Sequence, residues 1–401
     1  MKQRRSSVAA TLSLLAAAAC ADPAAPPALD ADPAAASRAV AADEAEPIPG
    51  QYIVVFRDGV ADAPGLARRL AAGNGASVRH TYQHAIKGFS ANMSEQAAAA
   101  LARNPNVAYV EQDQAVSKSE MQSGAPWGLD RIDQRALPLS KTYSYSNTGR
   151  DVRAYIIDSG ILTSHNDFGG RATPGFSSIA DGRGSSDCDG HGTHVAGTVG
   201  GNTYGVAKGV SLIAVRVLDC SGSGSWSGVI AGIDWVTANH VRPAVANMSL
   251  GGGASSSVDQ ATANMIAAGV ATAVAAGNGN RGGRQQDACN YSPARVATAM
   301  TIGATTQTDA KTSWSNYGTC VDFFAPGYQI VSAGITSNTA TVAMSGTSMA
   351  SPHVAGVAAL YLQSNPGASA QQVRDALFAA TTKGVVTSSS TANNHLLFTN
   401  Y

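Results

Sequence analysis

The stretch Arg153-Ala154-Tyr155-Ile156-Ile157-Asp158-Ser159-Gly160 begins with a short apolar run and ends with a carboxylate and a turn. Short, nearly continuous apolar runs are typical of parallel strands that are covered on both faces. Four more runs of this kind follow, and helical patterns lie between them. Strands are expected at 153–157, 212–215, 244–248, 271–274 and 300–302, and helices at 192–200, 226–239 and 257–268. This succession predicts an α/β domain of three layers, with a central parallel sheet between helices.

Three polar side chains stand where such a sheet places its active site. Asp158 follows its strand at the carboxyl end, while His191 (in 190–194) and Ser348 (in 346–353) each begin a predicted helix. Active sites of parallel sheets gather at the carboxyl ends of strands, and helix N-termini offer free N–H groups to negative charge. A serine hydroxyl needs a base, and that base needs an orienting carboxylate. The order Asp, His, Ser therefore predicts Ser348 as nucleophile, His191 as base and Asp158 as orienting group.

Each of the three residues also has a simpler interpretation. Alone, Asp158 suits a turn, His191 a surface loop and Ser348 a helix N-cap. His191 and His194 are three apart without a glutamate between them, unlike the H-E-x-x-H pattern of zinc proteases. An α/β-hydrolase esterase requires G-x-S-x-G and a serine that precedes its acid and histidine, whereas Ser348 comes last. The ordered trio favours the catalytic interpretation.

Composition and the first residues bear on partners and location. The 401 residues carry 27 Lys+Arg and 27 Asp+Glu, so a net charge of zero gives no reason to expect nucleic acid or an anionic membrane. Lys2, Arg4 and Arg5 precede an apolar run at 8–19, which predicts a secretory signal over 1–20. Cys20 leaves a lipoprotein signal open as the alternative to ordinary cleavage. No later apolar run predicts a membrane span, and we expect a secreted protein.

A spacer and a small module are expected between the signal and the sheet domain. Residues 21–49 are mostly Ala, Pro, Asp and Glu, which predicts a flexible spacer. Within 50–118 the predicted strands are 52–56, 78–82, 88–92 and 107–110, and the predicted helices are 64–72 and 94–104. This βαββαβ order predicts a ferredoxin-like α+β module.

From Ala125 to about Leu397 the chain resembles the proteinase K branch of subtilases, and aqualysin-type enzymes most. The resemblance rests on the triad motifs and on the stretches 125–135, 247–253 and 275–278. It implies a subtilisin-like catalytic domain over 122–401, which hydrolyses proteins and peptides with broad specificity and needs no cofactor for the chemistry. We expect a monomer. The alternative is a non-catalytic peptide-binding protein of the same fold, which covalent labelling of Ser348 by a fluorophosphonate would exclude.

By the same resemblance, 50–118 is an inhibitory propeptide that assists folding and is then removed by the enzyme itself. The segment 116–122 would lie in the active site as the first product, and the mature chain would start near Glu120 to Gln122. A permanent accessory domain is the alternative, because small α+β modules recur across unrelated functions.

The resemblance also implies a set of binding residues. Asn278 matches the side-chain donor of the oxyanion hole, although an asparagine between two glycines also suits an ordinary turn. An extended peptide with large apolar or aromatic side chains would bind along residues Gly222, Ser223, Gly224, Ser249, Leu250, Gly251, Ala275 and Gly277. The loop 279–288 is longer than its family counterparts, and its two arginines either tune specificity or are only solvated.

Cysteines and calcium are the remaining expectations. The four cysteines after Cys20 can pair in three ways, and the resemblance implies Cys188–Cys220 and Cys289–Cys320. Cys188 as a reactive thiol near His191 is the alternative. Calcium sites are implied at Asp130, Asp133 and Gln134, and at Asp322 with the carbonyls of Ala297 and Ala299. Ser140 and Thr142 stand where some relatives supply Asp and Asn, so Asp130 and Asp133 also suit a solvated face.

Overall fold

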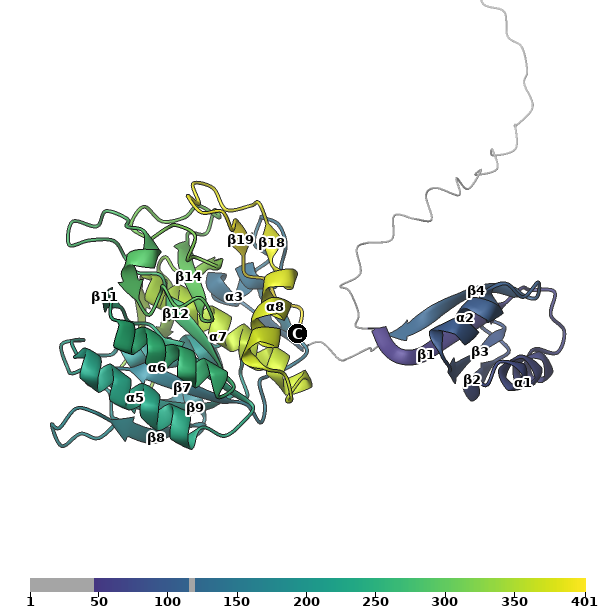
Figure 1. The fold of residues 1–401 in the computed structure, drawn as a ribbon, viewed down its shortest axis with the longest axis horizontal. Coiled ribbons are helices and arrows are strands. Elements are labelled where there is room, and N and C mark those ends of the chain that lie inside the picture. Colours follow the sequence, from purple (N-terminus) through teal and green to yellow (C-terminus); the bar gives the residue numbers. More distant parts are fainter. Residues whose placement is uncertain (1–46, 115–119) are drawn as a thin grey trace, which may run out of the picture. The chain divides into compact units, whose positions relative to one another are not determined.

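The computed structural model describes residues 47–114 and 120–401. The expected signal over 1–20 with Cys20, the spacer up to residue 46 and the segment 115–119 lie outside these residues. Contacts between residues divide the chain into two units, Met1–Ala115 and Val116–Tyr401. Each unit contains a β-sheet of its own (Figure 1).

The described part of the first unit has the predicted βαββαβ order. Its antiparallel sheet has the strand order β2-β3-β1-β4. The elements are β1 (Pro47–Phe56), α1 (Ala63–Gly73), β2 (Ser77–Tyr82), β3 (Gly88–Asn92), α2 (Glu95–Ala102) and β4 (Val107–Gln114). Asp62 and Ser94 cap the two helices by accepting hydrogen bonds from backbone N–H groups of their first turns. Because β1 begins at Pro47, the strand extends into the end of the expected spacer.

A nine-stranded sheet forms the middle of the second unit. Neighbouring strands are parallel except β18 and β19, which are antiparallel. In spatial order the strands are β18 (Thr382–Lys383), β19 (His395–Leu396), β15 (Phe323–Pro326), β14 (Met300–Thr305), β12 (Val270–Ala275), β10 (Ala244–Met248), β7 (Arg153–Asp158), β9 (Ser211–Arg216) and β8 (Ala172–Ser177). The five strands predicted from the sequence occupy five neighbouring places, from β14 to β9.

Helices cover both faces of this sheet, which confirms the predicted three layers. In Figure 1, α5 (Trp226–Asn239) and α6 (Ser256–Ala267) lie side by side across one face, over the buried cluster that includes Ile157 and Val274. The other face packs against α4 (His191–Gly200) and α7 (Thr347–Ser364), over a larger cluster that includes Ile156. The further helices are α3 (Trp127–Ile132), α8 (Ala370–Ala380), η2 (Asn166–Phe168) and η3 (Ala288–Asn290). Among the described residues, no helix is both long and apolar enough to cross a membrane.

Three small strand pairs lie outside the large sheet. The first joins β5 (Glu120–Ser123) to β6 (Thr142–Tyr145) in four antiparallel residue pairs. The other two are β11 (Gly252–Gly253) with β13 (Tyr291–Ser292), and β16 (Ile330–Ala333) with β17 (Thr341–Met344). Since β5 pairs with β6, the chain belongs to the second unit from Glu120 onward.

Candidate active site

Asp158 and His191 meet at the carboxyl edge of the central sheet. Asp158 is the last residue of β7 and is completely buried, and His191 is the first residue of α4. Oδ1 of Asp158 lies 2.7 Å from Nδ1 of His191 and also accepts a hydrogen bond from the N–H of Ser159 at 2.7 Å. A buried carboxylate in this position orients the imidazole and stabilises its positive charge.

A second carboxylate, that of Asp187, fixes the loop that leads into α4. Its donors are the Ser159 hydroxyl, the N–H groups of Asp189 and Gly190, and both the N–H and the hydroxyl of Thr193. Gly190, the N-cap of α4, has a φ of 103°, in the left-handed region that glycine adopts without strain. The start of α4 is therefore tied to the residue that follows Asp158.

The charges around His191 raise the pKa of its imidazole. Burial alone lowers this pKa, but the charge and the hydrogen bond of Asp158 oppose burial, and the carboxylates of Asp189 and Asp187 add to the rise. The net rise strengthens His191 as an acceptor for a proton from a hydroxyl group.

Ser348 is the second residue of α7 and lies against Ser249. The Ser348 hydroxyl donates to the carbonyl of Ser249 at 3.2 Å, and the Ser249 hydroxyl donates to the carbonyl of Ser348 at 2.7 Å. Among the described residues, the hydroxyl of Ser348 is thus bonded to Ser249 and not to His191. Catalytic hydrogen bonds often form only in the complex with substrate, so this geometry is compatible with a nucleophilic serine.

Asn278 is held by the residue next to Ser348. Its Oδ1 accepts hydrogen bonds from the N–H and the hydroxyl of Thr347 at 2.8 and 2.9 Å, which leaves Nδ2 on the other side of the amide. A Cβ placed on Gly346 would lie 3.4 Å from Asn278 Nδ2 and 3.5 Å from the backbone nitrogen of Ser348. The two nitrogens therefore border the same small space, as donors to one oxyanion must.

A cavity of about 500 Å³ opens between two loop segments beside His191. It is lined by Asp189, His191, Leu218, Gly222, Ser223, Gly224, Ser225, Trp226, Val229, Ser249, Leu250, Gly251, Gly252 and Gly253. Six of the predicted binding residues are in this lining, whereas Ala275 and Gly277 are not. Gly277 instead donates its N–H to the Thr347 hydroxyl at 3.0 Å.

Asp189, Leu218 and Val229 line the cavity although the sequence had not singled them out as binding residues. Asp189 stands two residues before His191. Its position beside a motif is thus the only signal that the sequence offered for Asp189, and Val229 and Leu218 offered none.

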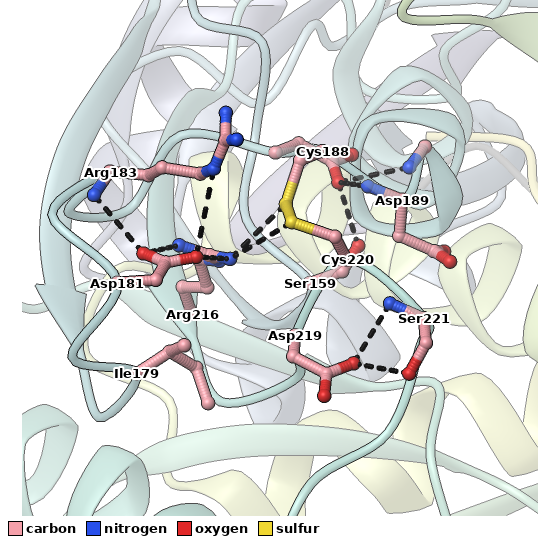
Figure 2. Close-up of a disulfide and its surroundings, with 12 residues drawn as sticks. Ser159, Ile179, Asp181, Arg183, Cys188, Asp189, Arg216, Asp219, Cys220 and Ser221 are labelled. Carbon is pink, nitrogen blue, oxygen red and sulfur yellow. Dashed lines mark hydrogen bonds and ion pairs between the residues drawn. A yellow bond between two sulfur atoms is a disulfide. The ribbon is translucent and has the colours of Figure 1, made fainter.

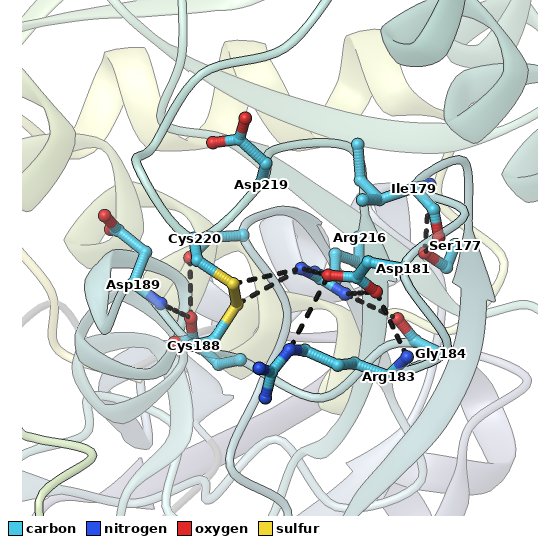
Figure 3. Close-up of polar contacts among 12 residues, drawn as sticks. Ser177, Ile179, Asp181, Arg183, Gly184, Cys188, Asp189, Arg216, Asp219 and Cys220 are labelled. Atoms are coloured by element: carbon cyan, nitrogen blue, oxygen red, sulfur yellow. Dashed lines mark hydrogen bonds and ion pairs between the residues drawn. A yellow bond between two sulfur atoms is a disulfide. The ribbon is translucent and has the colours of Figure 1, made fainter.

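The Cys188–Cys220 disulfide joins the loop before α4 to the loop that leads into the cavity segment. Figure 2 shows the guanidinium of Arg216 between this disulfide and the carboxylate of Asp181. Arg216 is completely buried, donates to both oxygens of Asp181 at 2.8 and 2.7 Å, and reaches Cys188 Sγ at 3.2 Å. In Figure 3, Arg183 extends along the same network. The second predicted disulfide, Cys289–Cys320, is also present, so Cys188 is no free thiol.

Comparison with protein families matches residues 149–397 to the subtilase family, over more than half of the chain. The chain is a subtilase. Residues 51–119 match the family described as peptidase inhibitor I9. This subtilase is therefore a serine endopeptidase with an N-terminal inhibitory propeptide, and the esterase and zinc-protease alternatives are excluded.

The relatives of this subtilase are proteinases. It is 53% identical over 372 residues to an extracellular serine proteinase from Thermus sp. (strain Rt41A), covering 88% of this chain and 90% of that one. It is 52% identical over 327 residues to alkaline serine exoprotease A of Vibrio alginolyticus, covering 80% of this chain and 60% of that longer relative. The crystal structure of a cold adapted subtilisin-like serine proteinase matches with 52% identity and a TM-score of 0.66, covering 69% of this chain and 98% of that one.

Subtilases generally bind calcium, and Asp130 with its neighbours is the first of the two sites implied by the sequence. The Asp130 carboxylate accepts hydrogen bonds from the Ser140 N–H, the Ser140 hydroxyl and the Lys141 N–H at 2.8 to 3.0 Å. The amide of Gln134 donates to the carbonyls of Ala136 and Pro138. Calcium needs six to eight oxygen ligands. Here both oxygens of Asp130 already accept hydrogen bonds from N–H and O–H groups. The residues here do not fit the ion, and Asp130 instead anchors the loop at 140–141.

The second implied site, at Asp322, does not fit calcium either. One oxygen of its carboxylate accepts the N–H of Thr301 at 2.9 Å. The other lies 2.6 Å from Nη2 of Arg374, which comes from α8. A positively charged group therefore already contacts the oxygen that a calcium ion would have to use.

Proposed function

We propose that Ser348 is the nucleophile of this subtilase, His191 its general base and acid, and Asp158 the carboxylate that orients His191. The observation that carries the proposal is the 2.7 Å contact between His191 Nδ1 and the buried Asp158 Oδ1. The Ser348 hydroxyl leaves the Ser249 carbonyl, gives its proton to His191 Nε2 and attacks the peptide carbonyl. His191 then protonates the leaving amine, and water releases the acyl group by the reverse sequence.

Asn278 Nδ2 and the Ser348 N–H would bind the oxygen that becomes negative in the tetrahedral intermediate. Their arrangement around Gly346 supports this role, because both nitrogens are within 3.5 Å of one point. Thr347 holds the amide of Asn278 in place before substrate arrives, so the donors need no reorganisation. Loss of one such donor costs about 2.7–4 kcal/mol in the barrier.

The substrate would be an extended polypeptide that lies between the segments 222–226 and 249–253. Both segments line the cavity beside His191, and their glycines leave room for main-chain pairing, which tolerates many sequences. We expect broad endopeptidase activity with a preference for large apolar or aromatic side chains. Ala275 and Gly277, small residues next to Asn278, would border the pocket for the side chain before the scissile bond.

Self-processing would separate the propeptide at 50–118 from a mature chain that begins near Glu120 to Gln122. The pairing of β5 with β6 supports this boundary, because residues from Glu120 onward are already part of the catalytic unit. The mature enzyme would comprise 122–401 or start up to two residues earlier.

The test compares wild type, Ser348→Ala and the control Ser364→Ala, which changes a serine at the other end of the same helix. Fluorophosphonate labelling and intact mass are measured for each. Wild type and Ser364→Ala should be labelled and start near Glu120 to Gln122, while Ser348→Ala should be unlabelled and keep its propeptide. Labelling of Ser348→Ala would refute the assigned nucleophile, and identical processing in all three would refute self-cleavage by Ser348.

We also propose export through the signal at 1–20 with ordinary cleavage, and a monomeric mature enzyme. The extracellular relative from Thermus supports export. Mass spectrometry of the protein from the culture medium tests it: a chain retained with cells and carrying a lipid on Cys20 would contradict ordinary cleavage.

A further inference from the structure

Arg374 and Asp322 form an ion pair at the end of the central sheet. Asp322 directly precedes β15, and Arg374 lies in the second turn of α8, 52 positions later in the chain. Nη2 of Arg374 is 2.6 Å from Asp322 Oδ1, and the side chains are 25% and 10% exposed. The pair is thus largely withdrawn from water, where opposite charges interact more strongly than at the surface.

Asp322 is also fixed to the neighbouring strand by the backbone. Its N–H donates to the carbonyl of Thr301 at 2.9 Å, and its Oδ2 accepts the N–H of the same residue at 2.9 Å. Thr301 belongs to β14, shortly after Ala297 and Ala299, whose carbonyls were expected to complete a calcium site. The carboxylate is therefore held against Thr301 of β14, two residues along the chain from Ala299.

The carboxylate needs a positive partner to remain ionised. The Asp322 side chain is only 10% exposed, and the guanidinium of Arg374 supplies the positive charge beside it. Without Arg374 a buried charge would be left uncompensated, which is strongly destabilising.

We propose that the guanidinium of Arg374 is the built-in cation of the Asp322 site and stands there in place of calcium. A calcium ion binds carboxylate oxygen at about 2.3–2.6 Å, and Arg374 Nη2 already lies 2.6 Å from Asp322 Oδ1. A divalent ion on this oxygen would lie against the guanidinium and be repelled by it, so the two cations exclude each other. Ion pair and metal site are alternative solutions for one buried carboxylate, and this chain uses the ion pair.

The experiment measures melting temperature in calcium and in EDTA, with mature enzyme inactivated by a fluorophosphonate to prevent autolysis. Wild type, Arg374→Ala, Arg374→Lys, Asp322→Asn and the double variant Asp322→Asn/Arg374→Ala are compared. Arg374→Ala should melt lower than wild type in EDTA and gain a calcium-dependent rise at least about 3 °C larger than that of wild type. The double variant should lose this extra rise, and Arg374→Lys, which keeps the charge, should behave as wild type.

Two results would overturn the proposal. The first is a calcium-dependent rise in melting temperature that is no larger in Arg374→Ala than in wild type, because calcium would then not bind the carboxylate that the substitution leaves free. The second is a smaller calcium-dependent rise in melting temperature in Asp322→Asn than in wild type, because calcium would then bind Asp322 while Arg374 is present.

If Arg374→Ala does not fold, Arg374→Gln replaces it, and bound calcium is counted directly in wild type and Asp322→Asn by atomic spectroscopy after gel filtration. Equal calcium content in these two proteins supports the ion pair. One ion fewer in Asp322→Asn refutes it.

Discussion

At the scale of single residues, three carboxylates raise the pKa of His191. Asp158 contacts the imidazole directly, while Asp187 and Asp189 act from the loop before α4. Only Asp189 among these three lines the cavity. Its negative charge therefore acts on both His191 and the cavity in which we propose that the peptide binds, so the pH response can be changed through Asp189 without altering Asp158, His191 or Ser348.

Asp189→Asn is expected to lower the pKa of His191, because it removes one of the charges that raise that pKa. The imidazole must be neutral to act as base, so the acid limb of the pH profile of kcat/KM should move to lower pH. An uncharged peptide substrate is used to measure the profile. Asp375→Asn, on α8, is the control and should leave the limb in place; the same position of the limb in Asp189→Asn would rule out this effect.

Gly346→Ala tests the space between the two proposed oxyanion donors. The Gly346 backbone is extended, with φ of 168°, so alanine fits without strain, and the added methyl makes only ordinary contacts of 3.4 Å and longer. The methyl would nevertheless fill the place of the oxyanion. We expect kcat to fall by about 10²–10³ with an unchanged melting temperature. Gly367→Ala, where a Cβ meets nothing within 4 Å, serves as control, and full kcat in Gly346→Ala would exclude Asn278 from this role.

At the scale of elements, the Cys188–Cys220 disulfide connects the loop before α4 with the segment that lines the cavity. Cys289–Cys320 closes a loop of nearly equal length, with a sequence separation of 31 against 32, but none of its residues lines the cavity. The two bonds thus form a matched pair, alike in their effect on chain entropy and different in their relation to the substrate.

Replacing either pair by two serines should lower the free energy of unfolding by about 3–4 kcal/mol in the chain-entropy model. Only Cys188→Ser/Cys220→Ser should also raise KM, because it frees the segment 222–226 from the start of α4. Urea unfolding of inhibited enzyme and peptide kinetics give the two quantities. Equal KM changes in both double variants would show that the first disulfide has no special role at the cavity.

The sequence predicted the elements that carry the site better than those that close the fold. Ala154–Ile157 is apolar on both faces, so its strand and the position of Asp158 at the carboxyl end follow from a local pattern, although the complete burial of Asp158 does not. By contrast, β5 and β6 are short, and Glu120–Ser123 becomes a strand only through its partner Thr142–Tyr145. No local pattern contains that information.

At the scale of the whole molecule, two buried histidines link the fold to pH. Desolvation lowers the pKa of His194 and of His353 to about 4 each. His194 Nε2 lies 2.9 Å from the carbonyl of Ile330, and His353 Nδ1 lies 2.8 Å from that of Met349. Both rings are therefore held neutral in the core, whereas in the unfolded chain they take up a proton below about pH 6.5.

Stability should therefore be complete above about pH 6.5 and fall as the pH drops toward 4, by up to about 3 kcal/mol per histidine. His191 acts in the opposite sense, since its raised pKa gives stability below pH 6.5 that is lost at higher pH. Urea unfolding of inhibited enzyme at pH 4.5 and 7.5 measures the difference. His353→Gln should reduce the difference in the free energy of unfolding between these two pH values. An unchanged difference would show that His353 does not contribute to the pH dependence of stability.

Long-range pairing also explains why the residues expected to bind calcium have other partners in the fold. Asp130 and Asp322 have the residue type that calcium requires, and the family resemblance of the sequence implied them as ligands. In the fold, the loop at Ser140 brings hydrogen-bond donors to Asp130, and helix α8 brings the guanidinium of Arg374 to Asp322. A ligand set predicted from one stretch of chain omits whatever the fold brings to it from elsewhere.

The pairing of β5 with β6 would help to make propeptide cleavage irreversible. A cut before Glu120, the boundary proposed above, would create a new N-terminal amine, and the first four residues of that chain are those that pair with Thr142–Tyr145. Rejoining the chain would require that this amine return to the acyl group on Ser348, against the pull of the strand that holds it. Re-formation of the cleaved peptide bond is therefore disfavoured, and we expect each molecule to pass from precursor to mature enzyme once.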